Sequence, residues 1–194
     1  ISQSYSTAAV IGENDVGGFV GSSSGHPNPG IIEDSYATGP VQGVQNVGGL
    51  LGMFYYAGTV RRAYATGSVK GDTNVGGLIG YIEKVEDVTI QHAFYDADST
   101  GVAEGIGAIS DSDPTGLDVT AIFDPFGAAT YDEPGDPTDF NFGAADSPWG
   151  IVEGVSYPYL VWRFPKGPSV VSGNVFGVAG GNDTVGIGVG VDGR

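Results

Sequence analysis

Residues 35–52 read SYATGPVQGVQNVGGLLG, and two other stretches align with them without a gap over eighteen positions. Residues 4–21 read SYSTAAVIGENDVGGFVG, and residues 63–80 read AYATGSVKGDTNVGGLIG. The three copies follow one another at offsets of 31 and 28 residues, and a degraded fourth copy begins near Phe94. Self-similarity at a period of roughly 20–50 residues is typical of repeat architectures. The sequence therefore indicates a tandem array.

The copies share residue types with separate structural roles. A tyrosine and the threonine two residues later point to one face of a strand. A glycine at a fixed place suggests a turn with positive φ or a close backbone approach. An Asp or Asn suits a turn and could stack as a polar ladder, and a valine leads into a Gly-Gly block that is interpreted as a strand. The recurring positions are Tyr5, Tyr36 and Tyr64; Gly12, Gly43 and Gly71; Asp15, Asn46 and Asn74; and Val16, Val47 and Val75.

Each copy is expected to contain about three short strands separated by turns. Such a unit cannot bury its apolar face alone, but copies stacked about 4.8 Å apart close a shared core. The pattern therefore predicts an all-β fold, a parallel β-solenoid of three to four turns. An antiparallel sandwich is the rival interpretation, and identical spacing in consecutive copies favours the solenoid because like side chains can then stack.

The repeat resembles a known family at this level of detail. Residues 35–39 and 46–52 are similar to the GLUG motif repeat, residues 63–80 match it equally well, and residues 4–21 depart from it at Asp15 and Phe19. The resemblance covers about residues 1–108, and residues 149–160 are similar to a segment that often follows such repeats. The family recurs in large bacterial exoproteins, including filamentous-haemagglutinin-like adhesins and some surface peptidases. It implies a right-handed solenoid, in line with the general rule for parallel crossovers, and an exported protein. It implies no single chemistry.

Three regions are expected along the chain. Residues 1–108 form the solenoid, residues 109–164 an acidic, irregular capping module, and residues 165–194 a linker and the first strands of a further β module. Residues 115–123 are the one stretch interpreted as a short helix. An open solenoid end exposes strand edges, so an aromatic-rich cover is expected there. Its candidate residues are Trp149, Tyr157, Tyr159 and Trp162.

Composition restricts the partners and the setting. The chain has 23 acidic and 7 basic residues and a net charge of −16, which disfavours binding to nucleic acid or to an anionic membrane surface. No apolar run is long enough to cross a membrane. Because Ile1 opens in the middle of a repeat, we expect the chain to be part of a longer polypeptide with its export signal in the flanks.

Candidate catalytic patterns are weak in this sequence. Residues 21–25 read GSSSG, which formally matches a nucleophile elbow, but they lie in an inter-repeat connection with no helix expected after them. His26 and His92 lack the spacing of a zinc site. Arg61 and Arg62 are adjacent, so a regular strand would point them to opposite faces. No acidic position recurs in the three clear copies, and we expect no enzyme activity.

Calcium is the one cofactor that the sequence suggests. Asp96 and Asp98 begin like a calcium loop, but Gly107 occupies the place of the bidentate acid, so the EF-hand pattern fails. A looser site that adds Asp111 or Asp113 stays open, beside the interpretation as solvated acidic loops. A second acidic group comprises Asp132, Glu133, Asp136 and Asp139.

Binding is expected in the segments between the copies. Residues 53–62 contain Phe54, Tyr55 and Tyr56, which could stack on sugar rings or anchor a protein, or could equally pack against neighbouring loops. The favoured function is a structural or adhesive segment, a stalk, fibre or surface adhesin, of a large extracellular bacterial protein. Its partners would be cell-surface or matrix components such as glycans. The alternatives are a region of a carbohydrate-active β-helix enzyme and a matrix filament subunit that self-associates through β-edges.

Overall fold

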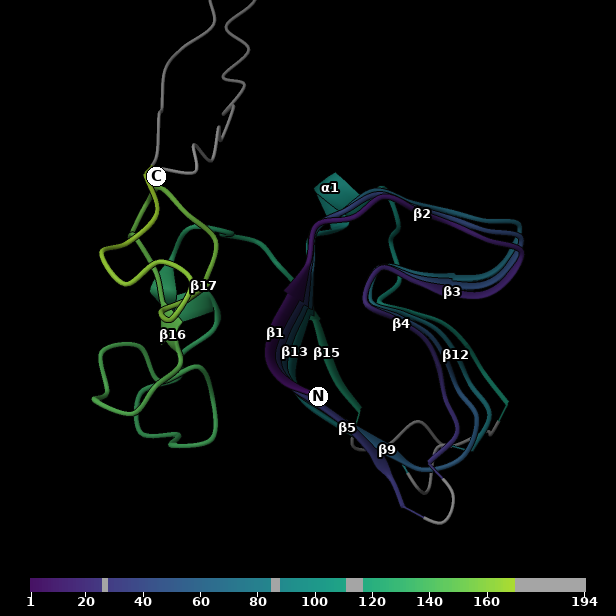
Figure 1. Ribbon diagram of the computed structural model, residues 1–194, viewed down its shortest axis with the longest axis horizontal. Helices are drawn as coiled ribbons and strands as arrows, with labels where there is room; N and C mark the ends of the chain where they lie inside the picture. Colours follow the sequence, from purple (N-terminus) through teal and green to yellow (C-terminus); the bar gives the residue numbers. More distant parts are fainter. Residues whose placement is uncertain (26–27, 85–87, 111–116, 170–194) are drawn as a thin grey trace, which may run out of the picture.

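The computed structural model describes residues 1–25, 28–84, 88–110 and 117–169. Four coils lie on top of one another in register, so the chain winds into a parallel β-solenoid (Figure 1). This confirms the predicted fold class and excludes the antiparallel sandwich. No helix in the described residues is long and apolar enough to cross a membrane.

Each of the first three coils contributes four strands rather than the three expected. The first contains β1 (Ser2–Ser6), β2 (Val10–Ile11), β3 (Asn14–Gly17) and β4 (Val20–Ser23); the second β5 (Gly30–Ala37), β6 (Val41–Gln42), β7 (Gln45–Gly48) and β8 (Leu51–Phe54). The third contains β9 (Gly58–Ala65), β10 (Val69–Lys70), β11 (Thr73–Gly76) and β12 (Ile79–Ile82). The fourth replaces two strands by the short helix α1 (Ala97–Thr100), between β13 (Val88–Tyr95) and β14 (Ile106–Ile109).

Strands of successive coils pair in parallel and build four stacks. Their orders are β1-β5-β9-β13-β15, β10-β6-β2, β11-β7-β3 and β14-β12-β8-β4, where β15 is Leu117–Ala121. Tyr5 pairs with Tyr36, Tyr36 with Tyr64, and Tyr64 with Phe94. The valines at positions 16, 47 and 75 pair in the same way. The predicted columns of like side chains are therefore confirmed, including the degraded fourth copy.

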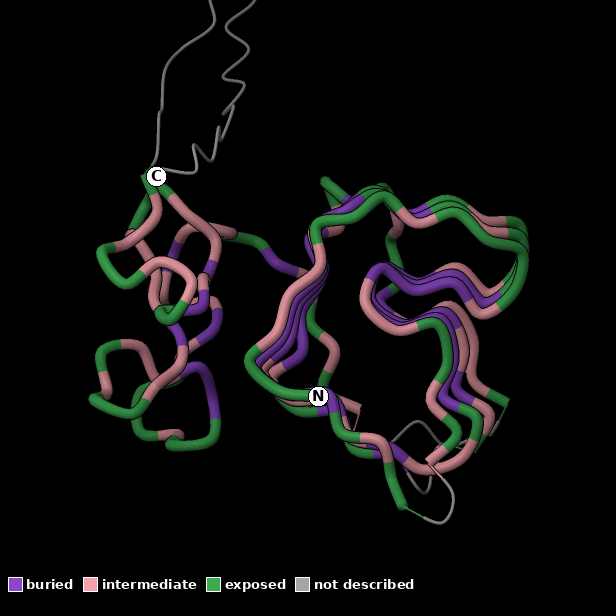
Figure 2. Tube along the Cα trace, viewed as in Figure 1, coloured by how far each residue is buried: buried purple, intermediate pink, exposed green. Residues whose placement is uncertain are grey.

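The main core lies between the stack that contains β5 and the stack that contains β8 (Figure 2). Leu50, Leu51, Leu78, Ile79 and Ile82 are fully buried in it. A smaller core of stacked valines, including Val16, Val41, Val47 and Val69, fills the other lobe of the coil. Both cores run through all the coils, so no coil is stable without its neighbours.

The Gly-Gly block, which the sequence suggested was all strand, is divided: Gly48 ends β7, and Gly49 and Leu50 form the bend before β8. A Cβ atom built on Gly49 would lie only 2.2 Å from the carbonyl oxygen of Gly77 in the next coil. The recurring glycine before β7 has a different role, because a Cβ on Gly43 would lie 2.8 Å from Val16 and Val47 side chains. Both positions need glycine for close approach and not for positive φ.

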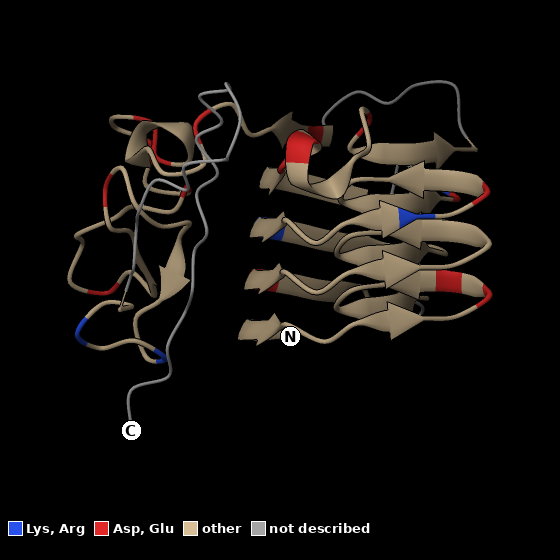
Figure 3. Ribbon diagram, turned by 90° about the horizontal axis from the view of Figure 1, so that it is seen from above, with Lys and Arg blue, Asp and Glu red and all other residues tan. Residues whose placement is uncertain are grey.

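Residues 122–169 form a separate unit, called here the lateral module. It contains the 3₁₀ turn η2 (Ala128–Thr130) and a small antiparallel pair, β16 (Trp149–Gly150) and β17 (Tyr159–Leu160). The lateral module lies beside the stack of β1, β5, β9 and β13, and Figure 3 shows it running along the height of the coils. The aromatic-rich module is present, but the expectation that its aromatics close an open end was wrong.

The region around residue 115 also differs from expectation. Leu117–Ala121 is strand β15 and pairs with β13, so the helix expected over residues 115–123 is absent from the described part of that range. The alternating residues of LDVTA support a strand once a neighbouring coil offers a partner edge. The stacks thus continue past the boundary expected at residue 108, and the strands expected after residue 170 lie outside the described residues.

Candidate functional site

The outward face of the β1-β5-β9-β13 stack carries a column of aromatic rings. The ring centroids of Tyr5 and Tyr36 are 5.3 Å apart, and those of Tyr36 and Tyr64 are 5.0 Å apart with nearly parallel planes. Trp149 of the lateral module lies 6.1 Å from both Tyr36 and Tyr64. Tyr64 is only 2% exposed and donates a hydrogen bond to the carbonyl oxygen of Pro158. We call this contact the aromatic seam; it fixes the lateral module to the solenoid.

The aromatic seam changes the acidity of its hydroxyl groups. Burial raises the pKa of Tyr36 to about 12, with a further contribution from Tyr5. Burial also raises the pKa of Tyr64 and of Tyr131, whose ring packs edge-on against Phe94 at 5.1 Å. These hydroxyls therefore stay neutral near pH 7, as expected for groups that serve packing and not acid–base chemistry.

A second column, here called the bulge column, lies beside the aromatic seam. Gln3, Asp34, Arg62 and His92 adopt positive φ values of 46°, 47°, 45° and 49°. These residues are not paired in the strand ladder, although their neighbours are: Glu33 pairs with Arg61, and Ser35 pairs with Ala63. Each bulge turns two consecutive side chains toward the same side of the stack.

The bulge column corrects the expectation that Arg61 and Arg62 point to opposite faces. Both guanidinium groups lie near the same carboxylate: Arg61 forms a close ion pair with Glu33, and Nη2 of Arg62 lies 3.8 Å from it. Arg62 also donates from Nε and Nη2 to the carboxylate of Asp34, at 2.5 and 2.8 Å. The hydrogen bond with Asp34 is the main cause that raises the pKa of Arg62.

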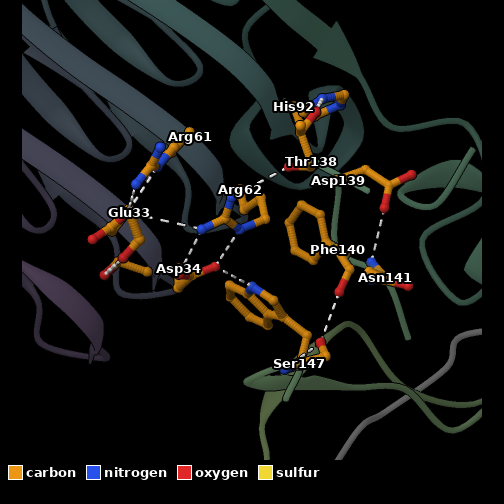
Figure 4. Close-up of polar contacts among 12 residues, drawn as sticks. Glu33, Asp34, Arg61, Arg62, His92, Thr138, Asp139, Phe140, Asn141 and Ser147 are labelled. Carbon is orange, nitrogen blue, oxygen red and sulfur yellow. Dashed lines mark hydrogen bonds and ion pairs between the residues drawn. The ribbon is translucent and has the colours of Figure 1, made fainter. Parts of the chain in front are cut away.

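Every member of the bulge column touches the lateral module, and Figure 4 shows Asp34, Arg62 and His92 beside it. The indole Nε1 of Trp149 donates to Asp34 at 2.9 Å, and that of Trp162 donates to the carbonyl oxygen of Gln3 at 3.0 Å. Arg62 donates to the carbonyl oxygen of Thr138 at 3.2 Å. The ring of His92 lies 3.1 Å from the hydroxyl of the same threonine. All four coils are therefore tied to the lateral module by a polar contact.

The two proposed calcium ligands have different surroundings. Asp96 is buried and caps α1, accepting from the backbone of Asp98 and Ser99, from the Ser99 hydroxyl at 2.7 Å and from the hydroxyl of Tyr157. Burial alone would raise the pKa of Asp96, but these hydrogen bonds outweigh it and lower the pKa. Asp98 is exposed. Both oxygens of Asp96 thus already have protein donors.

The remaining acidic residues give no cluster for a metal within the described ranges, where no three or more His, Cys, Asp or Glu side chains converge. Asp111 and Asp113 lie outside these ranges, as does His26. In the lateral module, Asp139 is buried and accepts from the backbone N–H groups of Glu133 and Asn141 at 2.5 and 2.9 Å. Burial and the neighbouring Asp139 raise the pKa of Asp132. The hydrogen bonds of Asp139 therefore stabilise the conformation of this acidic loop.

The aromatic candidates after β8 are divided between core and surface. Phe54 is fully buried and belongs to the main core. Tyr55 is 43% exposed, and its ring meets that of the half-buried Tyr56 edge-on at 4.9 Å. Nζ of Lys84 lies 5.2 Å from the centre of the Tyr56 ring. Tyr55 and Tyr56 are therefore the members of this group that a ligand could reach. Ser22 and Ser23 of the GSSSG stretch lie in β4, so no strand-to-helix elbow forms there.

Comparison with known proteins places the repeat in a family. Residues 12–42 match the model of the family described as the GLUG motif. In the structure these residues run from the turn after β2 to the end of β6, which is one full coil. This coil therefore carries the GLUG motif, as the resemblance had indicated. No curated protein and no solved structure gave a significant match.

Proposed function

We propose that this chain is a rigid structural segment of a large extracellular bacterial protein, used as a stalk, fibre or surface adhesin. The GLUG motif and the solenoid fold are typical of a repeat-type structural or surface segment. The extracellular setting and the adhesive role follow from the family resemblance and remain proposals. Immunolabelling of intact, non-permeabilised cells that produce the whole protein tests the setting, and label found only after permeabilisation would contradict it.

The observation that carries the proposal is the bracing of all coils by one unit. In the first coil, the carbonyl oxygen of Gln3 accepts a hydrogen bond from Trp162 of the lateral module. In the fourth coil, Asp96 accepts one from Tyr157 of the same module. In a plain solenoid each coil contacts only its neighbours, so the ends can fray independently. A module that spans the coils couples them, which suits a segment that must keep its length under load.

Force spectroscopy tests the rigidity. The segment is placed between marker domains and pulled through its ends, and we expect the solenoid and lateral module to unfold in one cooperative event. Tyr64→Ser, which removes the central ring of the aromatic seam, should split that event into smaller ones at lower force. Val161→Ser, a change at an exposed side chain of the lateral module, is the matched control. Coil-by-coil extension of the wild type at low force would contradict a rigid stalk.

Adhesion is tested at the exposed pair of tyrosines. Beads coated with the segment are expected to bind glycan or matrix surfaces, and the double change Tyr55→Ser and Tyr56→Ser should abolish binding while the melting transition stays nearly unchanged. Val44→Ser, at another exposed apolar side chain of the solenoid, is the control. Equal binding by the double variant would move the adhesive role elsewhere on the chain.

We also propose that the segment is not an enzyme. The recurring positions hold Tyr, Thr, Val, Gly, Asn and Leu, which build ladders and turns but supply no strong general acid or base. Turnover of polysaccharides or esters by the purified segment, lost on replacing one carboxylate, would overturn this.

A further inference from the structure

His92, the bulge-column member of the fourth coil, lies between two carboxylates that belong to different parts of the chain. Its Nδ1 atom is 3.9 Å from Oδ2 of Asp118 in β15, and its Nε2 atom is 3.4 Å from Oδ2 of Asp136 in the lateral module. The side chain of His92 is 18% exposed. Arg62, the member of the bulge column in the neighbouring strand β9, bonds to the backbone of Thr138, and its charge is matched by Asp34 and Glu33.

The hydrogen bonds define the tautomer of the neutral ring. The hydroxyl of Thr138 donates its one proton to Asp136, at 2.6 Å. At 3.1 Å from the same hydroxyl oxygen, Nε2 of His92 must therefore be the donor. The neutral ring then carries its proton on Nε2 and turns the bare Nδ1 toward Asp118. In this tautomer the lone pair of Nδ1 faces the Asp118 carboxylate, which is an unfavourable contact. A second proton on Nδ1 makes this contact attractive and gives the ring a positive charge that also attracts Asp136.

We propose that His92 is a pH-dependent latch that holds the lateral module more tightly to the solenoid when the imidazole is protonated. Histidine is the side chain that ordinarily changes its charge near neutral pH, so pH is the variable that tests the latch. Only the pair with Asp136 crosses between solenoid and lateral module, because Asp118 lies on the same stack as His92. The contact with Asp118 therefore acts within the solenoid, and the contact with Asp136 acts on docking.

The bulge column supplies its own replacements for a test. Gln3 and Arg62 occupy the equivalent place with nearly the same positive φ as His92, so His92→Gln and His92→Arg should both be accepted by the backbone. His92→Gln keeps a donor without charge, and His92→Arg carries a charge at every pH used. Asp136→Asn removes the partner charge and keeps the oxygen that accepts from Thr138.

Docking is measured by energy transfer between two dyes. The chain contains no cysteine, so cysteines placed at the exposed positions Lys70 and Ala145 label the solenoid and the lateral module uniquely. In the wild type, we expect the undocked fraction to rise about two- to fivefold from pH 5.5 to pH 8, the size that one partly exposed ion pair provides. His92→Gln should show the pH 8 value throughout, and His92→Arg the pH 5.5 value.

Asp136→Asn tests the same latch from the lateral module, and Asp146→Asn, at an exposed acid of that module, is its charge-matched control. The first should abolish the pH response and the second should keep it. The proposal is overturned if wild type and His92→Gln respond alike to pH, if His92→Arg behaves as His92→Gln, or if Asp136→Asn retains the full response.

Discussion

At the scale of single residues, a polar ladder holds strands β3, β7 and β11 in register just before the Gly-Gly block. Nδ2 of Asn74 donates to Oδ1 of Asn46 at 2.7 Å, and Nδ2 of Asn46 donates to Oδ1 of Asp15 at the same distance. All three residues have φ values between 53° and 55°, a left-handed conformation that Asn and Asp tolerate better than most residues. Two requirements therefore favour Asn or Asp at this position: the left-handed backbone conformation and the hydrogen bonds between the stacked side chains.

Asn46→Asp should break this ladder. The change leaves the backbone conformation acceptable, but it removes the donor to Asp15 and places two carboxylates side by side. We expect a loss of about 1–3 kcal/mol in the free energy of unfolding near pH 7, measured by urea denaturation. In the double variant Asp15→Asn and Asn46→Asp, donors alternate with acceptors again, so most of the loss should be recovered. An equally unstable double variant would show that the ladder bonds contribute little.

At the scale of elements, the sequence predicts what repeats and misses what does not. Identical spacing of Tyr36 and Tyr64 was sufficient to predict parallel stacking and the register. The bend at Gly49 was misread as strand because alternating Val and Gly fits a strand until the close approach of Gly77 to Gly49 is known. The segment at residues 115–123 was misread because pairing with β13, and not local propensity, decides its conformation.

The candidate site was harder to predict than the fold. The bulge column holds four different residue types, so no shared letter marks it, and nothing local shows that the alternation of side chains between the two faces is interrupted there. One signal was present: Glu33-Asp34 and Arg61-Arg62 are opposite charge pairs at equivalent places in adjacent copies. The partners Trp149 and Thr138 lie far along the chain, and only the folded structure brings them to this column.

The short helix α1 depends on one carboxylate at its start. Asp96→Ala is expected to lower the free energy of unfolding by about 0.5–2 kcal/mol, the usual cost of removing an N-cap, and to loosen Tyr157 of the lateral module. Because the pKa of Asp96 is lowered in the folded chain, its contribution is present above the unfolded-state value near pH 4 and is lost as the pH falls through the folded-state value. Denaturation from pH 7 down to acid measures it, and the variant should lose less stability than the wild type over that range. Equal losses would contradict the prediction.

At the scale of the whole molecule, the aromatic seam limits stability at alkaline pH. The raised pKa values of Tyr36, Tyr64 and Tyr131 give a contribution that is fully present below the unfolded-state value, about 10, and lost as the pH rises toward the folded-state values. We expect tyrosinate absorbance of these groups and loss of near-ultraviolet circular dichroism to appear together above about pH 10. Complete ionisation near pH 10 with an intact dichroism spectrum would contradict burial of the aromatic seam.

The net charge of −16 also acts on the whole molecule. Repulsion among the acids favours expansion, and added salt screens it over a shorter Debye length. We expect the melting temperature to rise when sodium chloride increases from about 0.05 to 0.5 M, within the range where screening changes most. A neutral osmolyte of equal osmolality, which does not screen charge, is the control. A falling melting temperature would mean that the ion pairs of the bulge column outweigh the repulsion.

The aromatic seam joins residues made early to residues made late. A ribosome completes Tyr5, Tyr36 and Tyr64 well before the rings that cover them, which are Trp149, Tyr157 and Trp162. The nascent chain therefore passes through a stage in which a finished solenoid displays a bare strip of stacked tyrosines, a surface prone to join with other chains. Premature termination after Ala121 would leave that strip permanently uncovered, so we expect the shortened product to fold into a solenoid that aggregates through its exposed tyrosines.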